Sequence, residues 1–248
     1  MRPFFEKHVL QQQPFKPMII VVDTTKAGSA SNTFVLPIIK AASETVKIYW
    51  GDGTNSMGVN GDNTHVYAAS GVYTVKIESK IFGGIYFNNL GDKAKITKIA
   101  NYGQGVSRLN IGSFYGCSSL LSIDIGNIVS NGADATNQYK SCTSLTTVPL
   151  FDLSSVTNAY AMFAYCAALT TVPLFNLSNC TNAANMFFGV TLTTQSYSDF
   201  LINLATLPLK SGVSFHGGNS KYNPAAAIAR AYLISNFGWT ITDGGAAP

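Results

Sequence analysis

Alternating apolar and polar side chains predict short strands in the first third of the chain. Residues 46–50 (Val-Lys-Ile-Tyr-Trp) and 72–77 (Val-Tyr-Thr-Val-Lys-Ile) alternate in this way, as expected of strands that bury one face. The β-branched runs at 19–22 and 33–38 add two further strand candidates. Several short strands separated by glycine and asparagine turns, without a helical period, predict an antiparallel sandwich over residues 18–80.

A repeat of 24 residues dominates the second half of the chain. Residues 142–158 and 166–182 match position by position, and a partial copy at 117–125 lies 25 residues earlier. One repeat of this length cannot bury its own apolar side, so the copies are expected to stack and share a core. The aromatic column predicted from this alignment is Phe114, Tyr139, Phe163 and Phe187. The predicted aliphatic columns are Leu145 with Leu169, Val148 with Val172, and Leu150 with Leu174.

Asparagine and cysteine also recur with the repeat. Asn158 and Asn182 are equivalent, so they are expected to cap turn backbone groups or to bond to each other. An even number of cysteines permits disulfides, but three of the four are equivalent and stack, and no Cys-x-x-Cys pair points to zinc. We therefore predict small, buried, free thiols at Cys117, Cys142, Cys166 and Cys180.

Residues 195–248 are predicted to form a terminal α/β unit. A helix is expected over 199–205, with Ser196 or Ser198 before it and an acidic first turn. A second helix is expected over 225–236, because Asn-Pro precedes it and glycine follows it. Such a unit would cap a stack of repeats, whose last copy otherwise exposes its core.

Composition limits the classes of partner. Only 11% of residues are charged, against about 25% in ordinary domains. The net charge of +4 is not gathered into a Lys/Arg patch, which argues against a nucleic-acid partner. No apolar run approaches the roughly 20 residues that span a bilayer, so membrane insertion is not expected. The N-terminus lacks the apolar core and cleavage site of a signal peptide, which predicts synthesis without export.

Candidate catalytic chemistry is sparse. The three histidines, His8, His65 and His216, fall in different segments, and no nucleophile-elbow, zinc-protease or phosphate-loop motif occurs. Asp52 and His65 suggest a metal or catalytic site. However, two residues are too few to hold a metal, and an aspartate in a Gly-Asp-Gly turn usually bonds to its own backbone. We predict no catalytic residue, no metal site and no cofactor.

The N-terminal strands carry one family resemblance. Residues 49–54 (Tyr-Trp-Gly-Asp-Gly-Thr), 65–67 (His-Val-Tyr) and 71–75 (Gly-Val-Tyr-Thr-Val) occur in that order. This set resembles the PKD-type Ig-like domain, although the residues that usually separate the tryptophan from the turn are missing. The resemblance implies a β-sandwich that acts as a spacer or an adhesive module.

The repeats carry a second resemblance. Phe-x-x-Cys-x-x-Leu, Val-Pro-Leu-Phe-x-Leu-Ser and Asn-x-x-x-Met-Phe recur across residues 111–190, and this pattern resembles the BspA-type leucine-rich repeat. That family is known from bacterial surface proteins and from bacteriophage tail or fibre proteins. The segment 127–137 departs from the pattern, and Gln138 stands where the later copies have methionine. The C-terminal unit resembles the cap that follows such repeats in phage tail-type proteins.

Together these patterns predict a mostly β protein with some α structure. The predicted order is an N-terminal docking arm at 1–17, a PKD-type Ig-like sandwich at 18–80, a leucine-rich-repeat solenoid at 81–194 and an α/β cap at 195–248. In the arm, the side chains expected to bury against a partner are those of Phe4, Phe5 and Phe15.

The resemblances imply a non-enzymatic structural protein of a bacteriophage virion, in its tail, fibre, baseplate or capsid decoration. Its expected partners are other virion proteins and a host surface glycan or protein. Aromatic and amide side chains bind such ligands without charge, and the candidate contacts are Asn158, Tyr160, Tyr165 and Asn182. The alternatives are a bacterial surface adhesin with leucine-rich repeats and a glycan-degrading accessory module. A homo-oligomer is left open, because no heptad repeat demands one.

Overall fold

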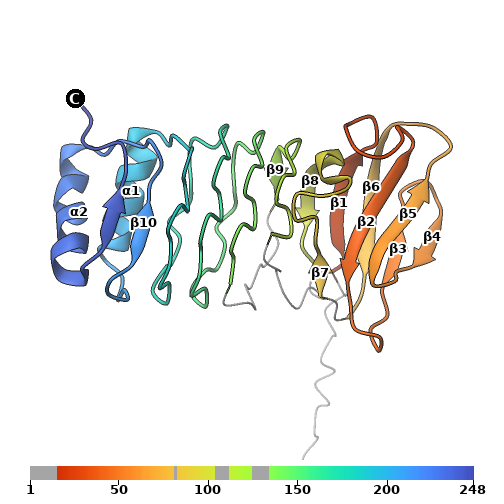
Figure 1. Cartoon of the computed structure of the whole chain (residues 1–248), viewed down its shortest axis with the longest axis horizontal. Coiled ribbons are helices and arrows are strands. Elements are labelled where there is room, and N and C mark those ends of the chain that lie inside the picture. The colour runs from red at the N-terminus through yellow and green to blue at the C-terminus, as the bar shows by residue number, and fades with distance from the viewer. Residues whose placement is uncertain (1–15, 81–82, 104–111, 125–133) are drawn as a thin grey trace, which may run out of the picture.

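The computed structural model describes residues 16–80, 83–103, 112–124 and 134–248. Within these ranges the chain is mostly β, and two α-helices lie near its C-terminus. The molecule is elongated: two sheets form one end, stacked coils form the middle, and the helices close the other end (Figure 1). The described ranges exclude the predicted docking residues, which are Phe4, Phe5 and Phe15.

The first end contains a six-stranded and a three-stranded sheet. The larger sheet has the order β4-β3-β6-β1-β8-β9, with strands β1 (Met18–Asp23), β3 (Lys47–Tyr49), β4 (Asn55–Met57), β6 (Val72–Glu78), β8 (Ile96–Asn101) and β9 (Ser122–Ile123). The smaller sheet has the order β5-β2-β7, with strands β2 (Thr33–Ile39), β5 (Gly61–Val66) and β7 (Gly84–Ile85). Burial alternates along residues 46–50, as predicted, and it also alternates along β1 and β2.

The larger sheet continues into the repeats. β1 pairs with β8, which lies beyond the predicted boundary at residue 80, and β8 pairs in parallel with β9. Ser122 of β9 then forms a parallel bridge to Thr147. A single hydrophobic core cluster therefore extends from Met18 to Trp239.

A buried ion pair holds the β1–β2 loop against the 3-10 turn Lys93–Lys95. Lys95 is fully buried, and its Nζ donates to the carbonyl oxygens of Ala30 (2.9 Å) and Thr33 (2.6 Å). The carboxylate of Asp92 lies 3.7 Å from this ammonium and accepts from the backbone of Ser29 (2.6 Å). No pattern in the sequence pointed to this pair.

Each repeat forms one coil, and backbone hydrogen bonds join successive coils. Tyr139 N donates to Met162 O (2.9 Å), and Phe163 N donates to Met186 O (3.0 Å). The predicted aromatic column is present: the rings of Phe114, Tyr139, Phe163 and Phe187 stack in parallel, with centroids 6.0, 5.6 and 5.7 Å apart. The aliphatic columns Leu145 with Leu169 and Val148 with Val172 are buried as well.

The third aliphatic column was predicted wrongly. Leu150 and Leu174 are 67% and 49% exposed, whereas the next residues, Phe151 and Phe175, are buried. In the second copy a tight turn lies at this place, in which Phe175 N donates to Pro173 O (3.0 Å). This turn directs the leucine outward and the phenylalanine into the core.

The polar predictions for the repeats are confirmed in outline. Asn158 Oδ1 accepts from Tyr160 N (3.1 Å), and Asn182 Oδ1 accepts from Ala184 N (3.0 Å). Asp134 extends this ladder by accepting from Thr136 N (2.8 Å). All four cysteines are buried and free, and burial raises the pKa of the Cys166 thiol to about 12.

The first C-terminal helix starts earlier than predicted. α1 spans Thr194–Leu204, and its N-cap is Thr193, whose hydroxyl accepts from Ser196 N (3.2 Å). The predicted caps were wrong because Ser196 Oγ accepts from the coil and Ser198 Oγ accepts from Asn223 N. Asp199 consequently lies beyond the first turn of α1.

The second C-terminal helix agrees with its prediction. α2 spans Pro224–Phe237, the Asn223 side chain caps its start, and Gly238 ends it in a left-handed conformation (φ 66°). The short parallel strands β10 (Ser214–His216) and β11 (Thr240–Thr242) pair beside the helices. None of the described helices is long and apolar enough to cross a membrane.

Candidate functional site

The Asp52–His65 pair joins the turn after β3 to strand β5. Asp52 Oδ1 accepts from Thr54 N (2.9 Å), as predicted for this turn, and Asp52 Oδ2 lies 2.7 Å from His65 Nε2. The His65 ring stacks on Trp50 with centroids 4.8 Å apart. Desolvation raises the pKa of Asp52, but the hydrogen bonds from Thr54 and His65 outweigh it and lower the pKa to about 2. The pair therefore fastens the turn to β5.

No metal-binding cluster accompanies this pair. In residues 16–80, 83–103, 112–124 and 134–248, no three His, Cys, Asp or Glu side chains lie close enough together to hold an ion. His216 lies far along the chain, where its Nδ1 accepts from Gly218 N (3.0 Å).

Two predicted contact residues, Tyr160 and Tyr165, meet in one surface hollow of about 230 Å³. We call this site the aromatic hollow. Its other lining residues come from the neighbouring coils and from the same coil: Lys140, Ala161, Ala164, Asn185 and Phe188. Three successive coils thus contribute to a single concave site.

The backbone of Tyr165 has an unusual conformation. Its φ is +62°, and the equivalent residues of the adjacent coils, Gly116, Ser141 and Gly189, also have positive φ. This region favours glycine, and a bulky side chain is a genuine outlier there. A Cβ on Gly189 would lie 3.0 Å from Tyr165 Cδ1, so this glycine makes room for the tyrosine ring. The side chain of Tyr165 is nevertheless 47% exposed.

Aromatic rings form one wall of the hollow. Tyr165 and Phe188 meet edge to face with centroids 5.3 Å apart. Phe188 makes a similar contact with His216 at 5.2 Å. Phe188 is 39% exposed, so the row presents ring surface to solvent.

Polar groups complete the hollow. Asn185 Nδ2 donates to Tyr160 Oη (3.3 Å), and Lys140 Nζ lies 5.1 Å above the centre of the Tyr115 ring. Within the described part of the chain, the Lys140 ammonium has no carboxylate partner. The described lining contains no acidic side chain. The hollow can therefore offer ring faces, two phenol hydroxyls, one amide and one positive charge to a ligand.

The other two predicted contacts, Asn158 and Asn182, do not line the hollow. Their side-chain oxygens accept backbone hydrogen bonds in the ladder between coils. The residues that sequence reasoning missed are Lys140, Asn185 and Phe188. Lys140 and Phe188 share one repeat position, directly after the aromatic column. The same position holds Ala164, which is buried, so the repeat alignment alone did not mark this position as exposed.

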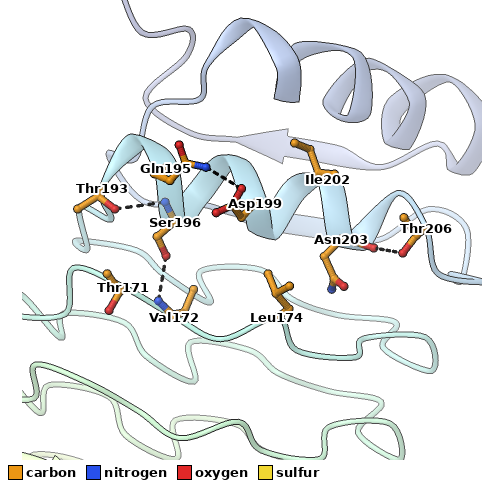
Figure 2. A pocket seen from close by; sticks show the side chains of 10 residues that line it. All are labelled: Thr171, Val172, Leu174, Thr193, Gln195, Ser196, Asp199, Ile202, Asn203 and Thr206. Carbon is orange, nitrogen blue, oxygen red and sulfur yellow. Dashed lines mark hydrogen bonds between the residues drawn. The ribbon is translucent and has the colours of Figure 1, made fainter.

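A larger groove of about 580 Å³ lies between α1 and the last coil (Figure 2). The polar side chains of α1 that line it form hydrogen bonds within the protein. Ser196 Oγ accepts from Val172 N (3.0 Å), and Gln195 Nε2 donates to Asp199 Oδ1 (2.8 Å). Asn203 Nδ2 donates to Phe175 O of the coil (3.4 Å). The groove is thus the seam where α1 docks on the coil, and the aromatic hollow is the stronger candidate site.

Comparisons with known proteins give no further identification. No protein-family model matches the chain. The searches of curated proteins and of solved structures also found no match. The candidate site therefore depends on the geometry described above.

Proposed function

We propose that the chain is a non-enzymatic structural protein of a bacteriophage virion, which uses its repeats for adhesion or host recognition. In this proposal the two sheets form a PKD-type Ig-like sandwich, and the coils form a short leucine-rich-repeat solenoid closed by an α/β cap. The arm at residues 1–17 docks on other virion proteins through Phe4, Phe5 and Phe15.

The observation that supports the recognition role is the left-handed backbone conformation of the exposed Tyr165. The adjacent coils have Gly116, Ser141 and Gly189 at the same left-handed position, so the fold itself does not need a tyrosine there. A large side chain at a left-handed position costs free energy, and such backbone outliers cluster at ligand sites. The aromatic hollow supports binding through shape and rings, in a chain that is poor in charge.

The location in the virion is tested on purified particles. Mass spectrometry of the virions is expected to detect this chain in a fixed ratio to other structural proteins. Removal of residues 1–17 is expected to abolish its incorporation, and unchanged incorporation would refute the docking role of the arm. A particle preparation that lacks the chain would refute the virion assignment.

The alternative is a bacterial cell-surface adhesin, which could use the same hollow. It predicts an export or sorting sequence encoded with the gene, whereas the virion proposal predicts neighbouring capsid, portal or tail genes. A glycan-degrading role predicts release of reducing sugars from host envelopes. We expect no release when the purified protein is incubated with them.

A further inference from the structure

We infer that the aromatic hollow binds one acidic sugar residue of a surface polysaccharide, a ring that carries a carboxylate or a phosphate. This inference rests on the proposed recognition function and assigns its ligand class. It depends on three features of the hollow, namely its rings, its unpaired ammonium and its size.

The rings provide a platform for the apolar face of a sugar. Tyr165 and Phe188 stand edge to face at 5.3 Å, and both remain partly exposed. Such rigid side chains give contact area at a low cost in conformational entropy. A flat, half-apolar ring is therefore a better occupant than a flexible chain.

The polar groups match a hydroxylated, negatively charged ligand. Tyr160 Oη and the Asn185 amide lie together at 3.3 Å and can exchange hydrogen bonds with sugar hydroxyls. Lys140 is the only charged residue in the described lining, and its ammonium lies 5.1 Å from the centre of the Tyr115 ring. Because no acidic side chain neutralises this ammonium there, the site favours an anion over a neutral ligand.

The size of the hollow favours a sugar over a protein surface. About 230 Å³ is smaller than a typical drug-sized ligand site and accommodates one ring. A stable protein interface needs about 800 Å² on each partner, with a well-packed apolar centre. Repeated sugar units along a polysaccharide would instead raise the effective affinity of one small site per molecule.

The test measures binding of the full chain to immobilised polysaccharides. The probes are polygalacturonate, which carries carboxylates, phosphomannan, which carries phosphates, and neutral dextran. We expect the wild-type protein to bind at least one acidic probe at least tenfold more tightly than dextran. The acidic probe that the protein binds shows whether the recognised group is a carboxylate or a phosphate. Failure of both acidic probes, or equal binding to dextran, would overturn the inference.

Variants locate the binding in the hollow. Tyr165→Gly installs the residue found at the equivalent positions Gly116 and Gly189, so it suits the left-handed backbone, and we expect at least a tenfold loss of binding. Lys140→Met keeps the aliphatic stem, and it is expected to abolish the preference for the acidic probe. Two matched controls, Tyr232→Ala on α2 and Lys210→Met in the loop before β10, remove the same groups elsewhere and should leave binding unchanged. Equal losses in the controls, or none in Tyr165→Gly, would overturn the assignment.

The same variants separate this inference from the proposed function. Host cells that adsorb wild-type protein and Tyr165→Gly equally well would overturn the sugar site but leave recognition standing. Absence of the chain from particles, together with Tyr165-dependent binding to an acidic probe, would overturn the virion role and leave the sugar site standing.

Discussion

Replacing Lys95 by methionine removes the ammonium at the centre of the β1–β2 loop and keeps a side chain of similar length. The change removes the hydrogen bonds that the ammonium donates to the carbonyl oxygens of Ala30 and Thr33. It also leaves the carboxylate of Asp92, which is 1% exposed, without its cation. Removing one member of a buried ion pair costs about 3–5 kcal/mol, a large part of the 5–15 kcal/mol that holds a typical domain folded.

Urea unfolding followed by circular dichroism measures this loss of stability. The urea concentration at the unfolding midpoint should fall, while the dependence of the unfolding free energy on urea stays unchanged. The control is Lys98→Met, because Lys98 and Asp124 form an exposed pair at 2.8 Å that is worth at most about 1 kcal/mol. Adding Asp92→Asn to Lys95→Met should recover about 1 kcal/mol or more, since it removes the uncompensated charge. A loss below about 1 kcal/mol for Lys95→Met would show that water replaces the ammonium, and would refute the reasoning.

Three further predictions concern the repeats and the N-terminal sheets. Phe151→Ala is expected to cost about 3–5 kcal/mol of stability, and Leu150→Ser less than about 0.5 kcal/mol. Thermal unfolding measures both losses. A larger loss for Leu150→Ser than for Phe151→Ala would contradict the burial of the phenylalanine. The pKa of Asp52 is lowered to about 2 from an ordinary value of 3.8, so its stabilisation is complete above pH 4 and is lost as the pH falls through 2. Melting temperatures between pH 2 and 5 should therefore fall more steeply for the wild type than for Asp52→Asn. Burial raises the pKa of Cys166 to about 12, so a thiol reagent at pH 8 should react rapidly only after unfolding.

Periodicity in the sequence predicted the architecture because each period has one structural cause. Alternation marks strands that bury one face, and residues 46–50 follow it residue by residue. A 24-residue repeat stacks along one direction, so equivalent residues such as Phe163 and Phe187 must meet. The free, buried cysteines follow from the same reasoning.

Periodicity does not indicate which way a side chain points at a turn. The alignment paired Leu150 with Leu174 correctly as equivalent positions, but it did not indicate that both face solvent. Strand β5 escaped prediction because Asn63 is its only buried residue, so no apolar alternation marks it. The Lys95–Ser29 contacts join residues 66 positions apart, a distance at which no local pattern operates.

The candidate site illustrates how such a stack can change its binding surface without changing its core. Each coil has two left-handed positions, and those around the site are filled by Asn137 and Ser141, Ala161 and Tyr165, and Asn185 and Gly189. The cost of a non-glycine residue there is about 1–2 kcal/mol, and it is smallest for short polar side chains. The buried aromatic column lies inside, so the outer residue at such a position can vary without disturbing the column. Tyr165 places a large exposed ring at such a position. A side chain at Gly189 would contact this ring, so the residues of the two coils are complementary in size there.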